Sequence, residues 1–458
     1  MDYDLIVIGS GPGGYVAAIR AAQNGLKVAC VDKRKELGGT CLNVGCIPSK
    51  ALLHASEFYY QTLHEAGDLG ILLGTPKIDF SKMMARKNEI VKGFNQGIAG
   101  LFKKNKVDFL VGTATFISPN AITIDGKEVT AQNFIIATGS EPTALPFAPF
   151  DEKQILSSTG ALALDAIPKK MVVVGAGVIG VELGSVYSRL GAKVHFIEFL
   201  DRICPALDDT IGKAFQKLLE KQGLTFELSS KVTAIEKAST VKITYETKDG
   251  IKTQEADAVL IAVGRRPYIQ DLGLEAAKVK LDDRGRIAVD TSFATSTPHI
   301  FAIGDVIDGP MLAHKASEEG IAVADLLAGK HSHLEYIAIP NVIYTDPEVA
   351  TVGLSESQAK EMGIQVKTGQ FPLKANSRAR CTADDDGLVK IVADAETGHL
   401  LGIHILSAHA GELIEIGSLA LEKRTTAYEL AKTSHAHPTL SEALKEAAMA
   451  IVSKPIHM

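Results

Sequence analysis

Short apolar runs alternate with helical patterns from the start of the chain. Asp4 to Ile8 is apolar, and it is followed by the turn Gly9-Ser10-Gly11-Pro12-Gly13-Gly14, a helix pattern of small residues through Ala22 and a second apolar run from Val28 to Asp32. Continuously apolar runs of this length are typical of buried parallel strands. The order predicts a strand, a glycine-rich turn, a helix and a second strand that ends in an acidic residue.

The same pattern recurs from Lys170 onwards. It consists of a strand over Lys170 to Val174, the turn Gly175-Ala176-Gly177-Val178-Ile179-Gly180, a helix over Val181 to Leu190 and a strand over Ala192 to Glu198. From residue 9 to 32 and from residue 175 to 198, the first glycine and the closing acidic residue are 23 positions apart. One glycine turn is a weak signal because glycines often only make turns, but two units in equal register predict two dinucleotide-binding sites.

Charge indicates which nucleotide the second unit binds. Glu198 would accept hydrogen bonds from a free ribose 2′-hydroxyl and would repel a 2′-phosphate, so this site is expected to prefer NAD over NADP. Arg202 lies nearby in the sequence, but a single arginine on a loop is expected to be solvated. In the first unit, Asp32 is expected to bind a ribose hydroxyl.

Two cysteines follow the first unit in the stretch Gly38-Gly39-Thr40-Cys41-Leu42-Asn43-Val44-Gly45-Cys46-Ile47-Pro48-Ser49-Lys50. In a helix, a rise of ~1.5 Å per residue would separate Cys41 and Cys46 by roughly 7.5 Å, whereas a disulfide needs Cα atoms within about 6.8 Å. A bridge therefore needs a tightened backbone, which Gly45 permits. Two buried structural cysteines are the alternative. Their position beside a nucleotide site favours a redox pair that exchanges two electrons with a flavin bound there.

Each unit closes with a further apolar strand and a glycine, Asn133 to Gly139 in the first and Ala258 to Gly264 in the second. Thr297 to Asp305 contains a short strand that delivers Asp305 just past a glycine, where its carboxylate could bind the ribityl chain of a flavin. A turn-capping aspartate is the equal alternative. A helix is predicted from Met311 to Ala328, and its N-terminal amides would favour electron-rich atoms of the flavin.

From Pro340 strands and helices alternate without glycine turns, which predicts a separate α+β domain. This part contains His435-Ala436-His437-Pro438-Thr439-Leu440-Ser441-Glu442 before the last helix. Thiol exchange needs a base because the thiolate is the attacking species, and a histidine oriented by Glu442 can supply one. From these residues alone, the simpler interpretation is two surface histidines ahead of a helix capped by Thr439 or Ser441.

Composition limits the possible partners and locations. The 458 residues suffice for about three domains of ~150 residues. The net charge of -6 and the lack of a lysine or arginine tract give no reason to expect nucleic acid or an anionic membrane as a partner. No apolar run reaches the ~18 residues of a membrane span. Because a strand pattern starts directly after Met1 and the five cysteines include one close pair, we expect a cytoplasmic protein without a signal peptide.

Eight stretches of the sequence together resemble the pyridine nucleotide-disulfide oxidoreductases. They are GSGPGG, GGTCLNVGCIPSK, NFIIATGS, GAGVIGVELG, AVGRRP, IFAIGD, IYTDPEVATVG and HAHPTLSE. The resemblance runs from Tyr3 to the last helix and is most specific to the branch that oxidises dihydrolipoyl groups in 2-oxo acid dehydrogenase complexes. It implies an α/β fold with two Rossmann-like dinucleotide-binding domains and a C-terminal α+β dimerisation domain. The expected divisions are an FAD-binding domain over residues 1–140, an NAD-binding domain over 141–267, a central segment completing the FAD domain over 268–339 and an interface domain over 340–458.

The resemblance also implies roles for individual residues. Cys41 would be the thiol attacked by substrate, Cys46 the thiolate beside the flavin, and His437 the base with Glu442 behind it. The residues implied to hold FAD are Gly9, Gly11, Gly14, Asp32, Lys50, Gly139, Asp305 and Ala313. The residues implied to line the NAD site are Gly175, Gly177, Gly180, Glu182, Glu198 and Gly264, and Glu182 would also pair with Lys50. No metal ion is expected.

Partners follow from the same resemblance. In the family, the histidine and glutamate reach the disulfide of the neighbouring subunit, so a homodimer is implied and a monomer would be inactive. The macromolecular substrate would be a lipoyl-bearing acyltransferase or the glycine cleavage carrier protein.

Related activities fit the residues less well. Glutathione and trypanothione reductases use NADPH, and its 2′-phosphate would require basic residues at the position of Glu198. A mercuric reductase would add a C-terminal cysteine pair, whereas the last cysteine here is Cys381. A soluble transhydrogenase typically lacks the full cysteine pair. A flavin-binding redox sensor or scaffold without turnover would not need Cys41, Cys46, His437 and Glu442 together.

Overall fold

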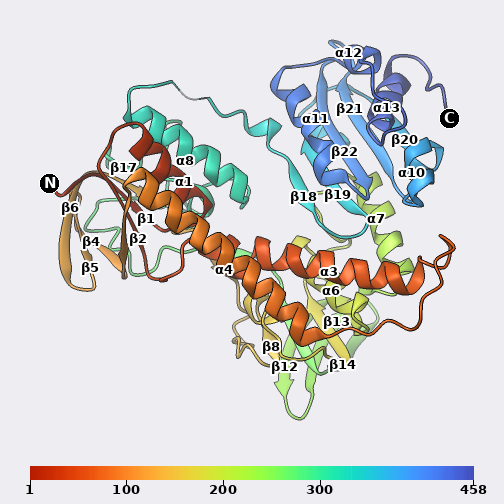
Figure 1. Ribbon diagram of the computed structural model, residues 1–458, viewed down its shortest axis with the longest axis horizontal. Helices are drawn as coiled ribbons and strands as arrows, with labels where there is room; N and C mark the ends of the chain where they lie inside the picture. Colours follow the sequence, from red (N-terminus) through yellow and green to blue (C-terminus); the bar gives the residue numbers. More distant parts are fainter. Residues whose placement is uncertain (332) are drawn as a thin grey trace. The chain divides into compact units, whose positions relative to one another are not determined.

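The computed structural model describes residues 1–331 and 333–458, which form two compact units (Figure 1). Each unit is assembled from segments that lie far apart in the sequence. The first unit comprises Met1–Leu52, Asp79–Thr143 and Gly264–Leu334, and the second comprises Leu53–Ile78, Ala144–Val263 and Glu335–Met458. The finer division into FAD, NAD, central and interface stretches stays a prediction.

A mostly parallel sheet forms the centre of the first unit. Its strand order is β3-β2-β1-β6, with β17 also paired to β6. The bounds are β1 Tyr3–Ile8, β2 Val28–Asp32, β3 Asp108–Val111, β6 Lys127–Ile136 and β17 Ile300–Ala302. The first half of β6 pairs antiparallel with β5 (Ala121–Ile124), which pairs in turn with β4 (Ala114–Ser118). The predicted strand, turn, helix and strand at the N-terminus are confirmed.

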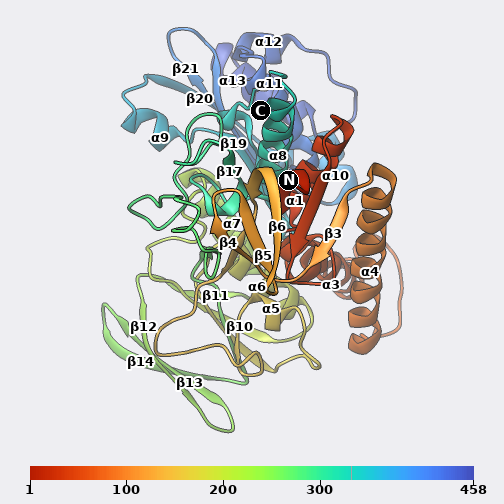
Figure 2. The same cartoon turned by 90° about the vertical axis from the view of Figure 1, so that its left-hand side faces the viewer.

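Alternating residues of the central strands face different layers. Leu5 and Val7 pack against the helices α1 (Pro12–Gln23) and α4 (Phe80–Asn105), whereas Ile6 and Ile8 belong to the core under the antiparallel strands. Helix α8 (Ala313–Leu327) lies beside α1 in both views (Figure 1 and Figure 2). The contact is close because Gly320 lacks a side chain: a Cβ there would lie 2.6 Å from the carbonyl oxygen of Gly13. Small residues in these two helices therefore hold them at a short backbone separation.

The second glycine-turn unit forms a second parallel sheet in the order β11-β10-β9-β15-β8. The bounds are β8 Ile155–Leu156, β9 Lys170–Val174, β10 Lys193–Ile197, β11 Thr225–Glu227 and β15 Ala258–Ile261, with helices α5 Ser158–Ala161, α6 Val178–Arg189 and α7 Asp209–Lys221. Three antiparallel strands, which the sequence analysis did not predict, pack beside it: β12 Lys231–Lys237, β13 Val241–Thr247 and β14 Gly250–Ala256. Their alternating apolar residues, such as Val241, Ile243 and Tyr245, are buried in one core with Val172.

The C-terminal part is the predicted α+β arrangement. Its antiparallel sheet has the order β18-β19-β22-β21-β20. The bounds are β18 Asn341–Ile343, β19 Glu348–Gly353, β20 Val366–Pro372, β21 Leu388–Asp394 and β22 Leu400–Ser407, with helices α9 Glu356–Glu361, α10 Ser377–Thr382, α11 Ala410–Glu422, α12 Ala427–Lys432 and α13 Glu442–Val452. Residues of α11, α12 and α13 share one apolar core with β19 to β22. The sheet therefore presents a rigid base for the residues just before α13.

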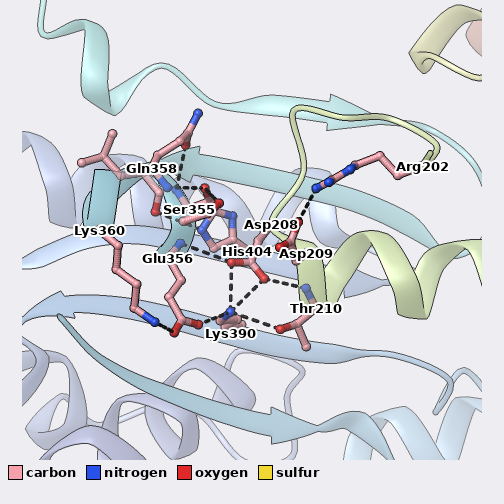
Figure 3. Close-up of polar contacts among 12 residues, drawn as sticks. Arg202, Asp208, Asp209, Thr210, Ser355, Glu356, Gln358, Lys360, Lys390 and His404 are labelled. Atoms are coloured by element: carbon pink, nitrogen blue, oxygen red, sulfur yellow. Dashed lines mark hydrogen bonds and ion pairs between the residues drawn. The ribbon is translucent and has the colours of Figure 1, made fainter. Parts of the chain in front are cut away.

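A buried ion cluster joins α7 to this sheet within the second unit (Figure 3). The Lys390 side chain is 2% exposed, and its Nζ donates to both carboxylate oxygens of Asp208 at 2.9 Å, to Glu356 at 2.7 Å and to Thr210 at 3.1 Å. Asp208 also accepts from the backbone N–H of Thr210, so it caps α7. Removing one partner of such a buried pair typically costs about 3–5 kcal/mol. The cluster thus fixes the start of α7.

Candidate active site

The first glycine turn leaves space only at its middle glycine. Gly9 has a φ of +104°, and a Cβ there would lie 2.3 Å from the carbonyl oxygen of Ala137. A Cβ at Gly14 would lie 1.8 Å from the carbonyl oxygen of Gly9, whereas one at Gly11 would meet nothing within 4 Å. Helix α1 begins directly after Gly11, and no side chain caps it. Its N-terminal amides therefore face an opening that fits a pyrophosphate.

The second turn repeats this construction. A Cβ at Gly175 would lie 2.6 Å from the carbonyl oxygen of Ala262, and one at Gly180 would lie 2.2 Å from the carbonyl oxygen of Gly175. A Cβ at Gly177 would meet nothing within 4 Å, and α6 begins after it without a side-chain cap. Both turns therefore fit a dinucleotide by the same geometry.

The acidic residues that close the two units occupy equivalent positions. Asp32 accepts from the backbone N–H of Ser10 at 2.8 Å, and Glu198 accepts from the backbone N–H of Ala176 at 2.6 Å. Each carboxylate thus contacts the residue after the first glycine of its turn. Arg202 pairs with Asp201 at 2.9 Å and with Asp209 at 2.7 Å, so two carboxylates already occupy its guanidinium.

The cysteine stretch is two helices that meet at Gly45. Helix α2 (Gly39–Val44) ends there and α3 (Cys46–His64) begins, and a Cβ on Gly45 would lie 3.0 Å from the carbonyl oxygen of Thr40 and 3.3 Å from the Cα of Cys41. This is the predicted tightening of the backbone. It brings the two thiols into hydrogen-bonding contact, and that hydrogen bond, with burial, raises the pKa of Cys41. Lys50 acts in the opposite direction through its charge.

Asp305 lies in a short 3₁₀ helix, η1 (Gly304–Val306), directly after β17. Its carboxylate accepts from the Ser140 hydroxyl at 2.5 Å, and Ser140 accepts in turn from Nε of Arg265 at 2.8 Å. Gly139 has a φ of +74°, and a Cβ there would meet nothing within 4 Å. The half-buried carboxylate is therefore held by a polar chain and does not cap the turn, in keeping with the flavin hypothesis.

The neighbouring backbone is fixed by α8. Lys315 donates to the carbonyl oxygen of Gly304 at 3.0 Å, and Glu319 accepts from its backbone N–H at 2.7 Å. The first residue of α8, Ala313, follows Leu312 without a side-chain cap. No side chain caps the N-terminal amides of α8, and their predicted interaction with electron-rich atoms of the flavin stays a prediction.

The histidine segment forms a second constellation in the second unit. The Nδ1–H group of His437 donates to Glu442 at 2.9 Å, and the other Glu442 oxygen accepts from the backbone N–H of Thr439 at 2.9 Å. Burial raises the pKa of the Glu442 carboxyl, but the hydrogen bonds from Thr439 and His437 together outweigh it, so the pKa of Glu442 is lowered. Ser441 precedes α13 without a capping hydrogen bond, and the Thr439 hydroxyl bonds to Ala436, so the capping interpretation was wrong. Because Nδ1 of His437 already donates to Glu442, the other ring nitrogen, Nε2, is the one that can accept a proton. The His437 side chain is 69% exposed.

Two family patterns cover nearly the whole chain. Residues 3–320 match the family described as pyridine nucleotide-disulphide oxidoreductase, and residues 339–448 match the dimerisation domain of that family. The chain belongs to the pyridine nucleotide-disulphide oxidoreductase family. Relatives include the mitochondrial dihydrolipoyl dehydrogenase 1 of Arabidopsis thaliana, 50% identical over 99% of this chain and 91% of that protein. The dihydrolipoamide dehydrogenase of Chaetomium thermophilum is 51% identical over 100% of this chain and 92% of that protein.

A solved structure agrees with the fold. The HOCl-induced flavoprotein disulfide reductase RclA from Escherichia coli superimposes with a TM-score of 0.87 at 27% identity, over 98% of this chain and 100% of that one. As a pyridine nucleotide-disulphide oxidoreductase, the chain uses FAD and NAD, and both expected cofactors are confirmed. No helix in the described residues is long and apolar enough to cross a membrane. The expected cytoplasmic location stays a prediction.

The predicted site residues divide between the two units. The first unit holds Gly9, Gly11, Gly14, Asp32, Cys41, Cys46, Lys50, Gly139, Gly264, Asp305 and Ala313. The second holds Gly175, Gly177, Gly180, Glu182, Glu198, His437 and Glu442. Glu182 is buried in α6 and accepts from the backbone N–H of Tyr344 at 2.9 Å, and its pairing with Lys50 stays a prediction.

Other residues near the candidate site were not predicted from the sequence. Arg265 is the main example: it contacts both the hydroxyl and the carbonyl oxygen of Ser140, and burial lowers its pKa while the charges of Asp305 and Cys46 oppose that effect. Arg265 is part of the motif AVGRRP, but a binding role was predicted only for the glycine of that motif, Gly264. Tyr15 lies close enough to Cys41 for the Cys41 charge to add to burial in raising the pKa of Tyr15.

Proposed function

We propose that the chain oxidises protein-bound dihydrolipoyl groups to the lipoyl disulfide and reduces NAD⁺ to NADH. The observation that carries the proposal is the Cys41–Cys46 pair, which Gly45 folds into contact beside the first glycine turn. Identity of about one half to two dihydrolipoyl dehydrogenases over nearly the full chain supports this substrate class.

Thiol exchange is the first half of the proposed reaction. A substrate thiolate attacks the Cys41 sulfur of the oxidised pair, the Cys41–Cys46 bond breaks, and its electron pair stays on Cys46 as a thiolate. The second substrate thiolate then attacks the substrate sulfur of the mixed disulfide and releases Cys41. The product is the lipoyl disulfide, and the enzyme holds two electrons.

Proton transfer falls to His437. A substrate thiol must lose a proton before it attacks, and Nε2 of His437 accepts it while Glu442 stabilises the resulting imidazolium. The match to a dimerisation domain supports a homodimer in which this pair serves the disulfide of the partner subunit. We propose a lipoyl-bearing acyltransferase or glycine cleavage carrier protein as the macromolecular substrate.

The two nucleotide sites connect the thiols to NAD⁺. The first turn, Asp32 and Asp305 would hold FAD, which when bound relays an electron pair from the dithiol to NAD⁺. The second turn would hold NAD⁺, with Glu198 selecting a free 2′-hydroxyl. Arg202 does not oppose this preference because Asp201 and Asp209 bind its guanidinium.

Steady-state assays with dihydrolipoamide and NAD⁺ test the proposal. Cys41→Ser and Cys46→Ser should abolish this activity and retain FAD, whereas Cys381→Ser, at an exposed cysteine, should not change it. Normal turnover of either active-pair variant would overturn the assignment. A wild-type protein that binds FAD and NADH but never oxidises dihydrolipoamide would point to the redox sensor instead.

A further inference from the structure

The helix that carries Cys41 is too short to be stable by itself. Helix α2 has six residues, and its N-cap Gly38 provides no side-chain hydrogen bond. Isolated helices this short are not stable in water, so contacts with other elements must fix it. Of its residues, only Leu42 is buried. The position of the Cys41 sulfur therefore depends on what holds α2.

A hydrogen-bond network of two asparagine side chains, Asn43 in α2 and Asn95 in another helix, supplies such a contact. Asn43, between the cysteines, donates to the carbonyl oxygens of Leu37 at 3.0 Å and Gly39 at 2.8 Å. Asn95 donates to the same Leu37 oxygen at 3.0 Å and to the side-chain oxygen of Asn43 at 3.1 Å. All four N–H donors of the two amides are used. A flipped Asn43 amide would turn its oxygen toward two carbonyl oxygens, so the network allows one orientation.

Asn95 connects this short helix to a rigid one. Helix α4 spans 26 residues, Asp79 caps its start, and Ile98 and Phe102 anchor it in the core that also contains Leu42. On the other side, a Cβ at Gly39 would lie 2.5 Å from the Cα of Gly11, so α2 begins against the first glycine turn. The amide pair thus holds the Cys41 helix between that turn and α4.

We propose that Asn95 is a positioning residue for thiol exchange: through Asn43 it fixes the helix that carries Cys41, and thereby sets the distance and the hydrogen bond between the Cys41 and Cys46 sulfurs. The inference rests on the proposed function, in which Cys41 bonds in turn to Cys46 and to the substrate sulfur. Asn95 touches no reacting atom, so its effect must pass through α2.

Three variants separate this role from general stability. Asn95→Ala removes two donors, whereas Asn95→Asp replaces them with a carboxylate that faces two oxygens and should disturb α2 more strongly. Asn105→Ala is the matched control, because Asn105 is on the same helix and its amide contacts only the Leu101 carbonyl oxygen at 2.8 Å among the described residues. The reduction of the enzyme by dihydrolipoamide should slow by about tenfold in Asn95→Ala and by more in Asn95→Asp. NADH oxidation by an artificial acceptor should not change.

A second readout does not depend on turnover. Cys41 in the two-electron-reduced protein can be alkylated with iodoacetamide across a pH series, and its peptide quantified by mass spectrometry. The hydrogen bond to Cys46 raises the Cys41 pKa, so loosening α2 should shift the alkylation profile of Asn95→Ala to lower pH, and that of Asn105→Ala should match the parent. Unshifted profiles in both Asn95 variants would overturn the proposal, as would equal losses in the dihydrolipoamide and artificial-acceptor rates. If the parent does not react with dihydrolipoamide, the proposed function fails, and the profile still decides the role of Asn95.

Discussion

Lys315 and Glu319 form a fully buried ion pair, 3.0 Å apart and one helical turn from each other in α8, with both side chains 0% exposed. The pair also binds both backbone polar groups of Gly304, whose φ is +75°. A buried charge pair is stable only when its remaining hydrogen-bonding capacity is used, and here Gly304 and the carbonyl oxygen of Asp308 contribute to that. The pair therefore fixes the residue that precedes Asp305.

Glu319→Gln should destabilise the protein and weaken FAD retention. It leaves Lys315 as an uncompensated buried charge, which typically costs about 3–5 kcal/mol, and it loosens the backbone that presents Asp305. The neighbouring exposed Glu318→Gln is the control. Urea unfolding and the flavin-to-protein absorbance ratio measure both effects. Equal FAD content in the two variants would show that the ion pair does not support the cofactor site.

His437→Gln should slow the thiol half-reaction by about 10²–10⁴-fold, the usual contribution of a general base. NADH oxidation by artificial acceptors bypasses the thiols and should stay close to the parent rate. His435→Gln is the matched control, since the ring of His435 hydrogen-bonds to Ser441, whereas the ring of His437 hydrogen-bonds to Glu442. Stopped-flow reduction by dihydrolipoamide gives the rates. An equal loss in both half-reactions would count against the base role.

Glu198→Ala should narrow the preference for NADH over NADPH by roughly tenfold or more. The variant loses a carboxylate that would accept a hydrogen bond from the 2′-hydroxyl of NADH and repel the 2′-phosphate of NADPH. Glu198→Gln keeps an acceptor without the charge and should fall between Glu198→Ala and the parent. The ratio of kcat/KM for the two nucleotides measures the preference. If it does not change, discrimination depends on other residues.

The stability of the second unit should depend on pH through Glu57. Burial, with the nearby carboxylate of Asp346, raises the pKa of Glu57 to about 7, although Arg189 partly opposes this. The folded state therefore binds a proton that the unfolded state releases at lower pH. The stabilisation is complete below about 4.5, the ordinary value, and is lost as pH rises through about 7.

Glu57→Gln should flatten this dependence. The Glu57 side chain is 32% exposed, so solvent screening limits the effect to about 1–2 kcal/mol between pH 5 and pH 8. Urea midpoints at the two pH values, with the surface variant Glu89→Gln as control, test it. If Glu57→Gln retains the pH dependence of stability of the parent protein, other titratable groups must cause that dependence.

Most helices and strands could be predicted from the sequence because the residues that define them, an apolar run and the turn residues at its ends, are neighbours in the chain. The strands Val28–Asp32 and Lys170–Val174 lie where the apolar pattern placed them, since turn residues follow each one. The strands β12 to β14 were missed although their alternating apolar residues carried a usable signal. The glycine turns and the cysteine pair were found for the same reason: their chemistry lies within a few consecutive residues.

Contacts between distant residues have no such signature. Lys390 and Asp208 are 182 positions apart, and nothing in either segment indicates a buried ion pair. Asn95 occupies an ordinary polar position of a long helix, so its contact with Asn43 emerges only when α4 is placed beside α2. Arg265 and Asp305 meet through Ser140 in the same way.

The absorbance spectrum during anaerobic two-electron reduction by dihydrolipoamide tests the central claim, that Cys41 and Cys46 exchange electrons with bound FAD. The wild-type protein should develop a long-wavelength thiolate-to-flavin band, and Cys46→Ser should retain FAD without developing it. Direct bleaching of the flavin in the wild type with no such band, or an unchanged band in Cys46→Ser, would contradict the account.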